Sequence, residues 1–218
     1  MRGRAIVTVG LLLLAGSAFG QTPQPGWIAD VRTGCRVWDA NPQPNESIKW
    51  SGACRNKLAQ GRGLLRWFQD GKPGPQARGT WRDGKMNGHG VITLPSGERF
   101  SGQWKNDQRN GHGVYAYANG DRYDGQYRND KKNGHGVYSY ADASRYNGEW
   151  RDGKKNGRGT EIHIDGSRYD GEWQGDLPDG FGTAVWLNGD RYAGLWIMGC
   201  YRSGTRTASW GVELSSCR

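Results

Sequence analysis

The sequence predicts an all-β protein, an elongated single-layer antiparallel sheet of stacked β-hairpins built from 23-residue repeats. Two observations predict this fold class. An aromatic-x-Gly-x-aromatic motif recurs every 23 residues, from residues 100–104 (FSGQW) to residues 192–196 (YAGLW). Side chains also alternate with a period of two, which places Tyr123, Gly125 and Tyr127 on one face of a strand.

The first segment is predicted to be a secretory signal peptide over residues 1–20. Arg2 and Arg4 supply a basic start, an apolar run follows, and residues 18–20 (AFG) place small residues before a cleavage site at Gln21. The apolar run is too short to be a good transmembrane anchor. Removal of the two arginines would lower the formal net charge from +9 to +7. We therefore expect a periplasmic or secreted protein.

The mature chain is predicted to contain a row of repeats between two end segments. Residues 21–49 are expected to form an N-terminal cap segment, and residues 50–76 a degenerate repeat that is four residues longer than the others. The regular repeats span residues 77–99, 100–122, 123–145, 146–168 and 169–191. Residues 192–218 are expected to form a partial repeat and a C-terminal disulfide cap.

Each repeat contains the residues of two strands and two turns. The first strand carries the aromatic motif, and a Gly-x-Gly segment such as Gly111 and Gly113 opens the second. Turn residues follow each strand, as in residues 118–121 (ANGD), where glycine adopts a positive φ at little cost. Ala143 stands where other repeats have a turn glycine, so a positive φ there would cost about 1 kcal/mol.

Glycines between aromatic residues predict how the hairpins stack. A ring from a neighbouring strand can lie over backbone that carries no side chain. Because a lone hairpin is at best marginally stable in water, the array is expected to be stable only as an array.

This recurring pattern resembles the MORN (membrane occupation and recognition nexus) repeat family, in an exported bacterial form. The resemblance covers residues 77–204 well and residues 50–76 weakly. It implies an elongated curved sheet and a scaffolding or tethering role, with lipid binding often proposed and self-association common. The chain departs from the family pattern at Ala77, at residues 161–164 and after Gly199.

Four cysteines lie in two pairs near the ends of the repeat array. The ends of an extended array are too far apart for a disulfide, whose Cα atoms lie within about 7 Å. Cys35 is therefore predicted to pair with Cys54, and Cys200 with Cys217. Each disulfide would staple an end cap and stabilise it by about 3 kcal/mol. A zinc site is disfavoured because no Cys-x-x-Cys pair is present.

The aromatic face is the first candidate binding surface. Part of it must be used for stacking between repeats, and the remainder is expected to stay exposed as a shallow groove for a protein partner or a second copy of the chain. The predicted binding residues on this face are Tyr123, Tyr127, Tyr146, Trp150, Tyr169 and Trp173. They continue into a ladder with Tyr115, Tyr117, Tyr138 and Tyr140.

The basic turns are the second candidate surface, for anionic lipid or polysaccharide. The predicted binding residues are Lys131, Lys132, Lys154 and Lys155, in line with Lys85 and Arg109. Aspartates in the same turns weaken the positive field, and a solvated edge whose charges discourage aggregation is the alternative interpretation.

No catalytic or metal-binding arrangement is predicted. His89, His112 and His135 share one position in successive repeats, but repeats two strands wide set them about 10 Å apart, too far to share an ion. The arginines and carboxylates opposite the aromatic face are expected to form cross-strand ion pairs. We predict no enzyme activity, no cofactor and no nucleic-acid partner. The leading hypothesis is an exported scaffold that binds protein along the aromatic groove; the alternative is an envelope-surface binder of anionic lipid or polysaccharide.

Overall fold

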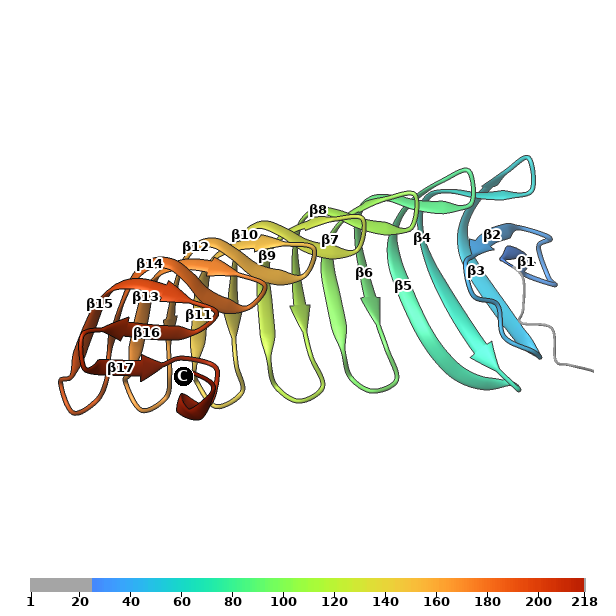
Figure 1. The fold of residues 1–218 in the computed structure, drawn as a ribbon. Coiled ribbons are helices and arrows are strands. Elements are labelled where there is room, and N and C mark those ends of the chain that lie inside the picture. Colours follow the sequence, from blue (N-terminus) through green and yellow to red (C-terminus); the bar gives the residue numbers. More distant parts are fainter. Residues whose placement is uncertain (1–24, 218) are drawn as a thin grey trace, which may run out of the picture.

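A computed structural model describes residues 25–217, so the predicted signal peptide over residues 1–20 lies outside the described part. These residues form a 17-stranded sheet drawn out into an elongated, curved array (Figure 1). The strands are β1 (Gly26–Ala29), β2 (Arg36–Asp39), β3 (Glu46–Arg55), β4 (Leu58–Gln69), β5 (Lys72–Arg82), β6 (Lys85–Thr93), β7 (Arg99–Lys105), β8 (Gln108–Ala116), β9 (Arg122–Arg128), β10 (Lys131–Ser139), β11 (Arg145–Arg151), β12 (Lys154–Ile162), β13 (Arg168–Gln174), β14 (Leu177–Val185), β15 (Arg191–Ile197), β16 (Cys200–Ser203) and β17 (Arg206–Ser209). A single 3-10 turn, η1 (Leu214–Ser216), follows.

Strands β3 to β17 pair antiparallel with their neighbours in chain order, which confirms the predicted fold class. The register sets glycine opposite glycine, as at Gly125 and Gly136 between β9 and β10. The β1–β2 hairpin does not continue this row of strands. It lies along the turns at the start of the array, where the Trp38 N–H donates to the Gly84 carbonyl over 2.9 Å. Among residues 25–217 we find no helix of the length and hydrophobicity required to span a membrane.

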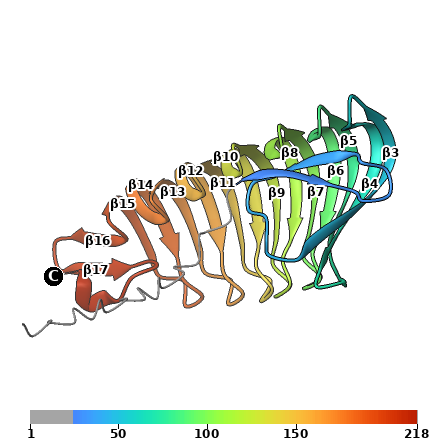
Figure 2. The ribbon, with the colours of Figure 1, turned by 90° about the vertical axis from the view of Figure 1, so that its right-hand side faces the viewer.

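Each long hairpin is folded at its Gly-x-Gly segment. The register shifts there, between Lys132 and Gly136 in the β9–β10 pair, which marks a β-bulge. The ammonium of Lys132 lies 4.5 Å from the ring centre of Tyr138, although six residues of straight strand would separate them by about 20 Å. Lys155 and Glu161, also six residues apart, form an ion pair. The strands are therefore bent, and side by side they form a trough (Figure 2). The buried aromatic side chains lie inside it.

Glycine pairs under aromatic rings explain the repeat motif. Tyr123 lies over Gly125 and Gly136, and a Cβ on Gly136 would stand 2.6 Å from its Cζ. The Tyr123 hydroxyl donates to the Gln126 carbonyl over 3.0 Å, and the Trp150 indole donates to the Gly136 carbonyl over 3.1 Å. Tyrosine and tryptophan thus combine apolar burial with a satisfied polar end.

Edge-to-face contacts join each repeat to the next. The ring centres of Tyr123 and Trp150, from successive repeats, lie 5.4 Å apart at an interplanar angle of 84°. Tyr146 and Trp173 repeat this contact at 5.3 Å. Each such pair adds about 1 kcal/mol beyond the area it buries.

The turns between paired strands also join the repeats. Asn129 and Asp130 have φ values of 48° and 67°, as a tight hairpin turn requires. The Asp130 N–H donates to the Arg109 carbonyl over 3.0 Å, and the Asp130 carboxylate accepts from the Arg109 N–H over 2.9 Å. Asp176 makes the same two bonds to Lys155. Turn aspartates therefore hold neighbouring repeats together in addition to offsetting positive charge.

Disulfides hold both ends of the array. Cys35 is bonded to Cys54 and Cys200 to Cys217, an arrangement compatible with an oxidising compartment. The buried Asp30 carboxylate, beside the first disulfide loop, accepts the Trp50 N–H over 2.8 Å.

The C-terminal edge of the sheet is protected against pairing with another chain. β16 covers only the end of β15. Carbonyls farther along β15 accept hydrogen bonds from side chains, Ala193 from the Tyr201 hydroxyl and Arg191 from the Arg206 guanidinium. Such capping blunts an edge strand.

Ala143 has a φ of 74°, the left-handed conformation that the equivalent turn glycines adopt. Ala143→Gly should therefore raise the free energy of unfolding by about 1 kcal/mol in urea titrations. Gly166→Ala is the matched control, since φ is 85° there and a Cβ would meet nothing within 4 Å. It should lower the free energy of unfolding by a similar amount. A neutral Ala143→Gly beside a destabilising Gly166→Ala would contradict this account of the turn.

Gly136→Ala should lower the free energy of unfolding by about 2 kcal/mol or more, because its Cβ would overlap the Tyr123 ring. Gly153→Ala tests backbone strain alone, with φ at 91° and no atom within 4 Å of the added Cβ. Thermal and urea unfolding measure the loss of stability in each of the two variants. Equal losses in the two variants would show that the ring contact does not matter.

Candidate functional site

The six aromatic residues predicted as an exposed binding groove are core residues instead. Their side chains are 0–5% exposed, so none is available to a partner. The fold at the Gly-x-Gly segment closes the trough over them, and rings of neighbouring repeats cover the rest. The buried residues are Tyr123, Tyr127, Tyr146, Trp150, Tyr169 and Trp173. This part of the predicted site is corrected.

Four tyrosines at the ends of β8 and β10, beyond the Gly-x-Gly bend, remain partly exposed: Tyr115, Tyr117, Tyr138 and Tyr140. They form two ring pairs, Tyr115 with Tyr117 at 4.3 Å and Tyr138 with Tyr140 at 4.7 Å. Burial raises the pKa of each hydroxyl, so all four stay neutral hydrogen-bonding groups at neutral pH. They are what the trough still offers to a ligand in the middle repeats.

The predicted basic edge is also corrected, because only half of it faces solvent. Lys131 and Lys154 are exposed, whereas Lys132 is half-buried and Lys155 is buried inside the trough. Successive residues of a strand point to opposite faces, which separates the two members of each pair. Arg109 occupies the position of Lys132 and Lys155 one repeat earlier.

These inward cations lie on aromatic rings. The Lys132 ammonium is 4.2 Å from the Trp150 ring centre, and the Arg109 guanidinium is 5.2 Å from that of Tyr127. Arg109 also pairs with Asp130 over 3.1 Å. Lys132 forms no ion pair with any residue between 25 and 217, and desolvation lowers its pKa to about 8.

The C-terminal cap closes one end of the trough. Trp210 stacks on His163 with 4.5 Å between ring centres, and its indole donates to Glu161 over 2.9 Å. Glu161 also binds the buried Lys155. The sequence departure at residues 161–164 therefore supplies a polar partner for this cap.

Polar and charged side chains predominate on the outer face of the middle repeats. Its arginine–carboxylate pairs run along single strands, Arg122 to Asp124 over 2.7 Å and Arg168 to Asp170 over 2.6 Å, which corrects the predicted cross-strand pairing of arginines with carboxylates. The three repeated histidines are exposed, and His112 contacts Asp124 over 3.0 Å. No group of three or more potential metal ligands occurs within the described residues.

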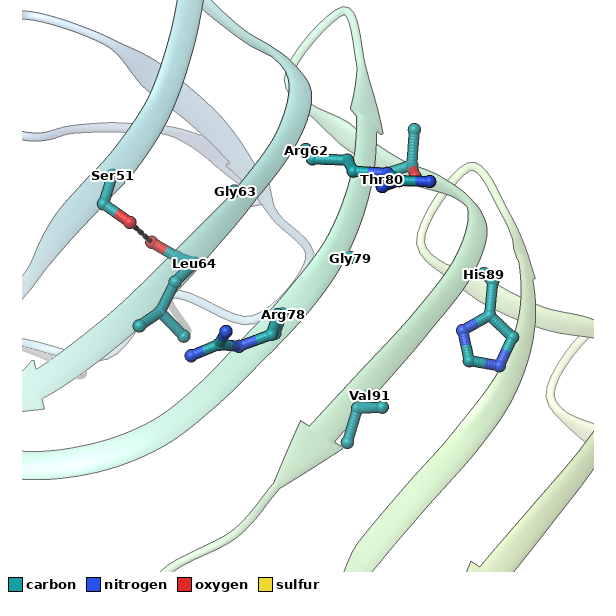
Figure 3. A pocket seen from close by; sticks show the side chains of 9 residues that line it. All are labelled: Ser51, Arg62, Gly63, Leu64, Arg78, Gly79, Thr80, His89 and Val91. Atoms are coloured by element: carbon teal, nitrogen blue, oxygen red, sulfur yellow. Dashed lines mark hydrogen bonds between the residues drawn. The ribbon is translucent and has the colours of Figure 1, made fainter.

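A wide, shallow hollow of about 540 Å³ lies on this face over β3 to β6 (Figure 3). Its side chains include Arg62, Arg78 and His89 around the glycine pair Gly63 and Gly79. The Ser51 hydroxyl donates to the Leu64 carbonyl over 3.3 Å, so this serine is not paired with a base.

Sequence reasoning missed an apolar patch on the outer face of β14 and β15. Phe181 is 70% exposed and lies directly across from Leu195, which is 50% exposed. Ile197 and Met198 extend the patch at 61% and 57%. At the four equivalent positions, the repeat at residues 123–145 has His135, Gln126, Arg128 and Asn129. Comparing repeats position by position would have found this change from polar to apolar.

Comparison with protein-family models finds the MORN repeat in five consecutive copies, at residues 78–99, 100–122, 123–145, 146–168 and 169–191. A comparison with curated proteins finds no match. One similar solved structure is the SAS-4 (dCPAP) TCP domain of Drosophila melanogaster, in complex with a proline-rich motif of Ana2 (dSTIL). It is 12% identical, covers 88% of this chain and 96% of its own, and has a TM-score of 0.38, a likeness that carries no functional argument.

The lowered pKa of Lys132 predicts a pH dependence of stability. Between about pH 8 and the ordinary lysine value of about 10.4, the unfolded chain binds the proton and the folded chain does not. The contribution of this residue to the free energy of unfolding should therefore rise with pH across that window. Urea titrations from pH 7 to pH 10 should show a rise that Lys132→Met removes and Lys131→Met keeps. Equal slopes in the wild type and Lys132→Met would contradict it.

Proposed function

Since this chain belongs to the MORN repeat family, whose repeats form non-enzymatic scaffolds, we propose that it is an exported scaffold that binds protein partners. Export is supported by the predicted signal peptide and by disulfides of the kind that persist in oxidising compartments. The repeats hold a long rigid surface, and no catalytic role is proposed for it.

The observation that carries this proposal is the apolar patch formed by Phe181, Leu195, Ile197 and Met198. Large apolar side chains gathered on one exposed surface mark protein interfaces, whereas scattered ones do not. Phe181 and Leu195 are cross-strand neighbours at two positions that the earlier repeats keep polar. The patch lies on a rigid strand pair, so a partner would bind it without ordering the backbone.

The four partly exposed tyrosines of the trough offer a second contact surface for the same kind of partner. Lys132 lies beside them without an ion pair in the described chain, so a partner carboxylate would supply its missing counter-charge. A second copy of this chain is one candidate partner.

The alternative function, binding anionic lipid or polysaccharide at the envelope surface, has weaker support. Of the four lysines expected on the basic edge, Lys132 and Lys155 are directed inward. Lys131 and Lys154 remain, and Asp152 lies 3.8 Å from Lys131. Such binding should weaken steeply with salt, whereas apolar contacts should respond little.

Phe181→His, Leu195→Gln and Ile197→Arg together restore the residues that the repeat at 123–145 carries at these positions, so the fold should be kept. We expect this triple variant to lose the partner that cross-links to the mature protein in native envelope extract, and any self-association seen by sedimentation velocity. Circular dichroism and the melting temperature check the fold.

The matched control is Lys131→Glu with Lys154→Glu, which should leave partner capture unchanged. Capture that survives the triple variant but is lost in the lysine variant would reverse the assignment in favour of the basic edge. Capture that survives both would remove the apolar patch as the interface.

A further inference from the structure

An aromatic pocket of about 290 Å³ lies at the N-terminal end of the trough. In this part of the array, β2, β3 and β4 meet the first regular repeats (Figure 1). Four tryptophans contribute to its wall, together with three carboxylates. The tryptophans are Trp38, Trp67, Trp81 and Trp104, and the carboxylates are Asp39, Glu46 and Asp107. The N-terminal hairpin supplies Trp38 and Asp39, so the pocket exists only once that hairpin is seated on the first turns.

The pocket exists because the first regular repeat departs from the others at two positions. Ala77 stands where later repeats have Phe100 or Tyr123, so a ring is missing from the trough. Met86 stands where later repeats have Arg109 or Lys132, and its sulfur covers Gly90 as a ring does elsewhere. Met86 fills only part of the space that a ring and a cation fill in other repeats, and the remainder is open as the pocket.

The later repeats show what this part of the trough accommodates. Lys132 lies 4.2 Å from the ring centre of Trp150, and Lys155 lies 4.8 Å from that of Trp173. Each is a cation on the face of an aromatic ring, an attractive contact that strengthens when solvent is excluded. The first regular repeat has the tryptophans but no cation of its own at this position.

The carboxylates make the pocket negative. One oxygen of Asp107 accepts the Met86 N–H over 2.6 Å, while its other oxygen, Oδ2, is buried without a hydrogen-bond partner in the described chain. Desolvation, together with smaller contributions from the charges of Asp39 and Asp130, raises the pKa of Asp107 to about 6. Desolvation and Asp39 also raise the pKa of Glu46. A buried carboxylate of this kind is stabilised by an incoming cation.

One internal cation faces this region. The Lys85 ammonium lies 4.8 Å from the ring centre of Trp38 and lowers the pKa of Asp107 in part. The nearby Arg109 guanidinium is paired with Asp130. With three carboxylates and one lysine, the pocket region has a net negative charge.

We propose that this pocket binds a small organic cation that carries a methylated ammonium group. Tryptophan faces bind such groups best, and a neighbouring carboxylate favours them over neutral molecules of the same shape. The proposal is independent of the protein interface at Phe181, which lies on the other face of the sheet at the opposite end of the array.

Choline and its uncharged isostere 3,3-dimethylbutan-1-ol test the proposal on the mature full chain. Calorimetry and tryptophan fluorescence should show saturable choline binding, with the isostere weaker by about tenfold because it lacks the charge. Equal binding of the two would make the site merely apolar and overturn the proposal. No saturable binding of choline would overturn it as well.

Two variants place the binding in this pocket. Asp107→Asn keeps the side-chain shape and should weaken choline binding by about tenfold. Met86→Lys should introduce the cation that later repeats carry and abolish binding. Asp124→Asn, on the outer face, is the matched control and should change nothing. Unaltered affinity in Asp107→Asn and in a folded Met86→Lys would place choline elsewhere and refute the assignment.

The pH profile gives a further readout. Because the pKa of Asp107 is about 6, choline affinity should rise from pH 5 to pH 7 in the wild type. Asp39, Glu46, Lys85 and Asp130 are the charged groups that act on this carboxyl and on its neighbours in the pocket. The Asp107→Asn variant should show a flatter profile over the same range. An identical profile in both would show that Asp107 does not contact the cation.

Discussion

The packing of an aromatic ring over a glycine pair is the contact on which the rest of this structure depends. Tyr123 covers Gly125 and Gly136, which face each other on paired strands, and the same arrangement recurs at Tyr146 and Tyr169. Since neither glycine has a side chain, the ring can approach the backbone, and the strands can bulge and bend beneath it. The bend turns a one-layer sheet into a trough with its own core, so the array needs no second layer to bury its aromatic residues.

Burial inside the trough then determines the chemistry of the polar residues there. Three cations lie over aromatic rings, Arg109, Lys132 and Lys155, and they differ in how their charge is balanced. Arg109 pairs with Asp130, Lys155 pairs with Glu161 beneath the C-terminal cap, and Lys132 has no ion pair within the described chain. Lys155 is the nearest of the three to the cap, where Trp210 closes the trough, and it is the one that is buried.

The fold could be predicted in most respects because its signals are local and repeated. Alternation and turn residues indicate hairpins, and the spacing of cysteines in an extended array leaves one plausible pairing. The accessibility of the aromatic residues could not be predicted, because alternation says which residues share a face but not that the strand bends until that face closes. Lys131 and Lys132 illustrate the same limit. They are adjacent in the sequence and resemble one basic cluster. Because successive strand residues point to opposite faces, Lys131 is exposed to solvent and Lys132 lies over Trp150.

A repeat array also contains its own reference for function. Positions that serve the fold are copied from one repeat to the next, so a position that changes character in a single repeat is released from that role or given another. The two ends of this array change in opposite ways. At the N-terminal end, Ala77 and Met86 remove a ring and a cation from the inside of the trough and leave a negative aromatic pocket. At the C-terminal end, Phe181 and Leu195 add large apolar side chains at outer-face positions where the earlier repeats carry polar residues. Because the middle repeats hold these ends at a fixed distance, a ligand at one and a partner at the other would be kept apart by a spacer whose length is set by the number of repeats.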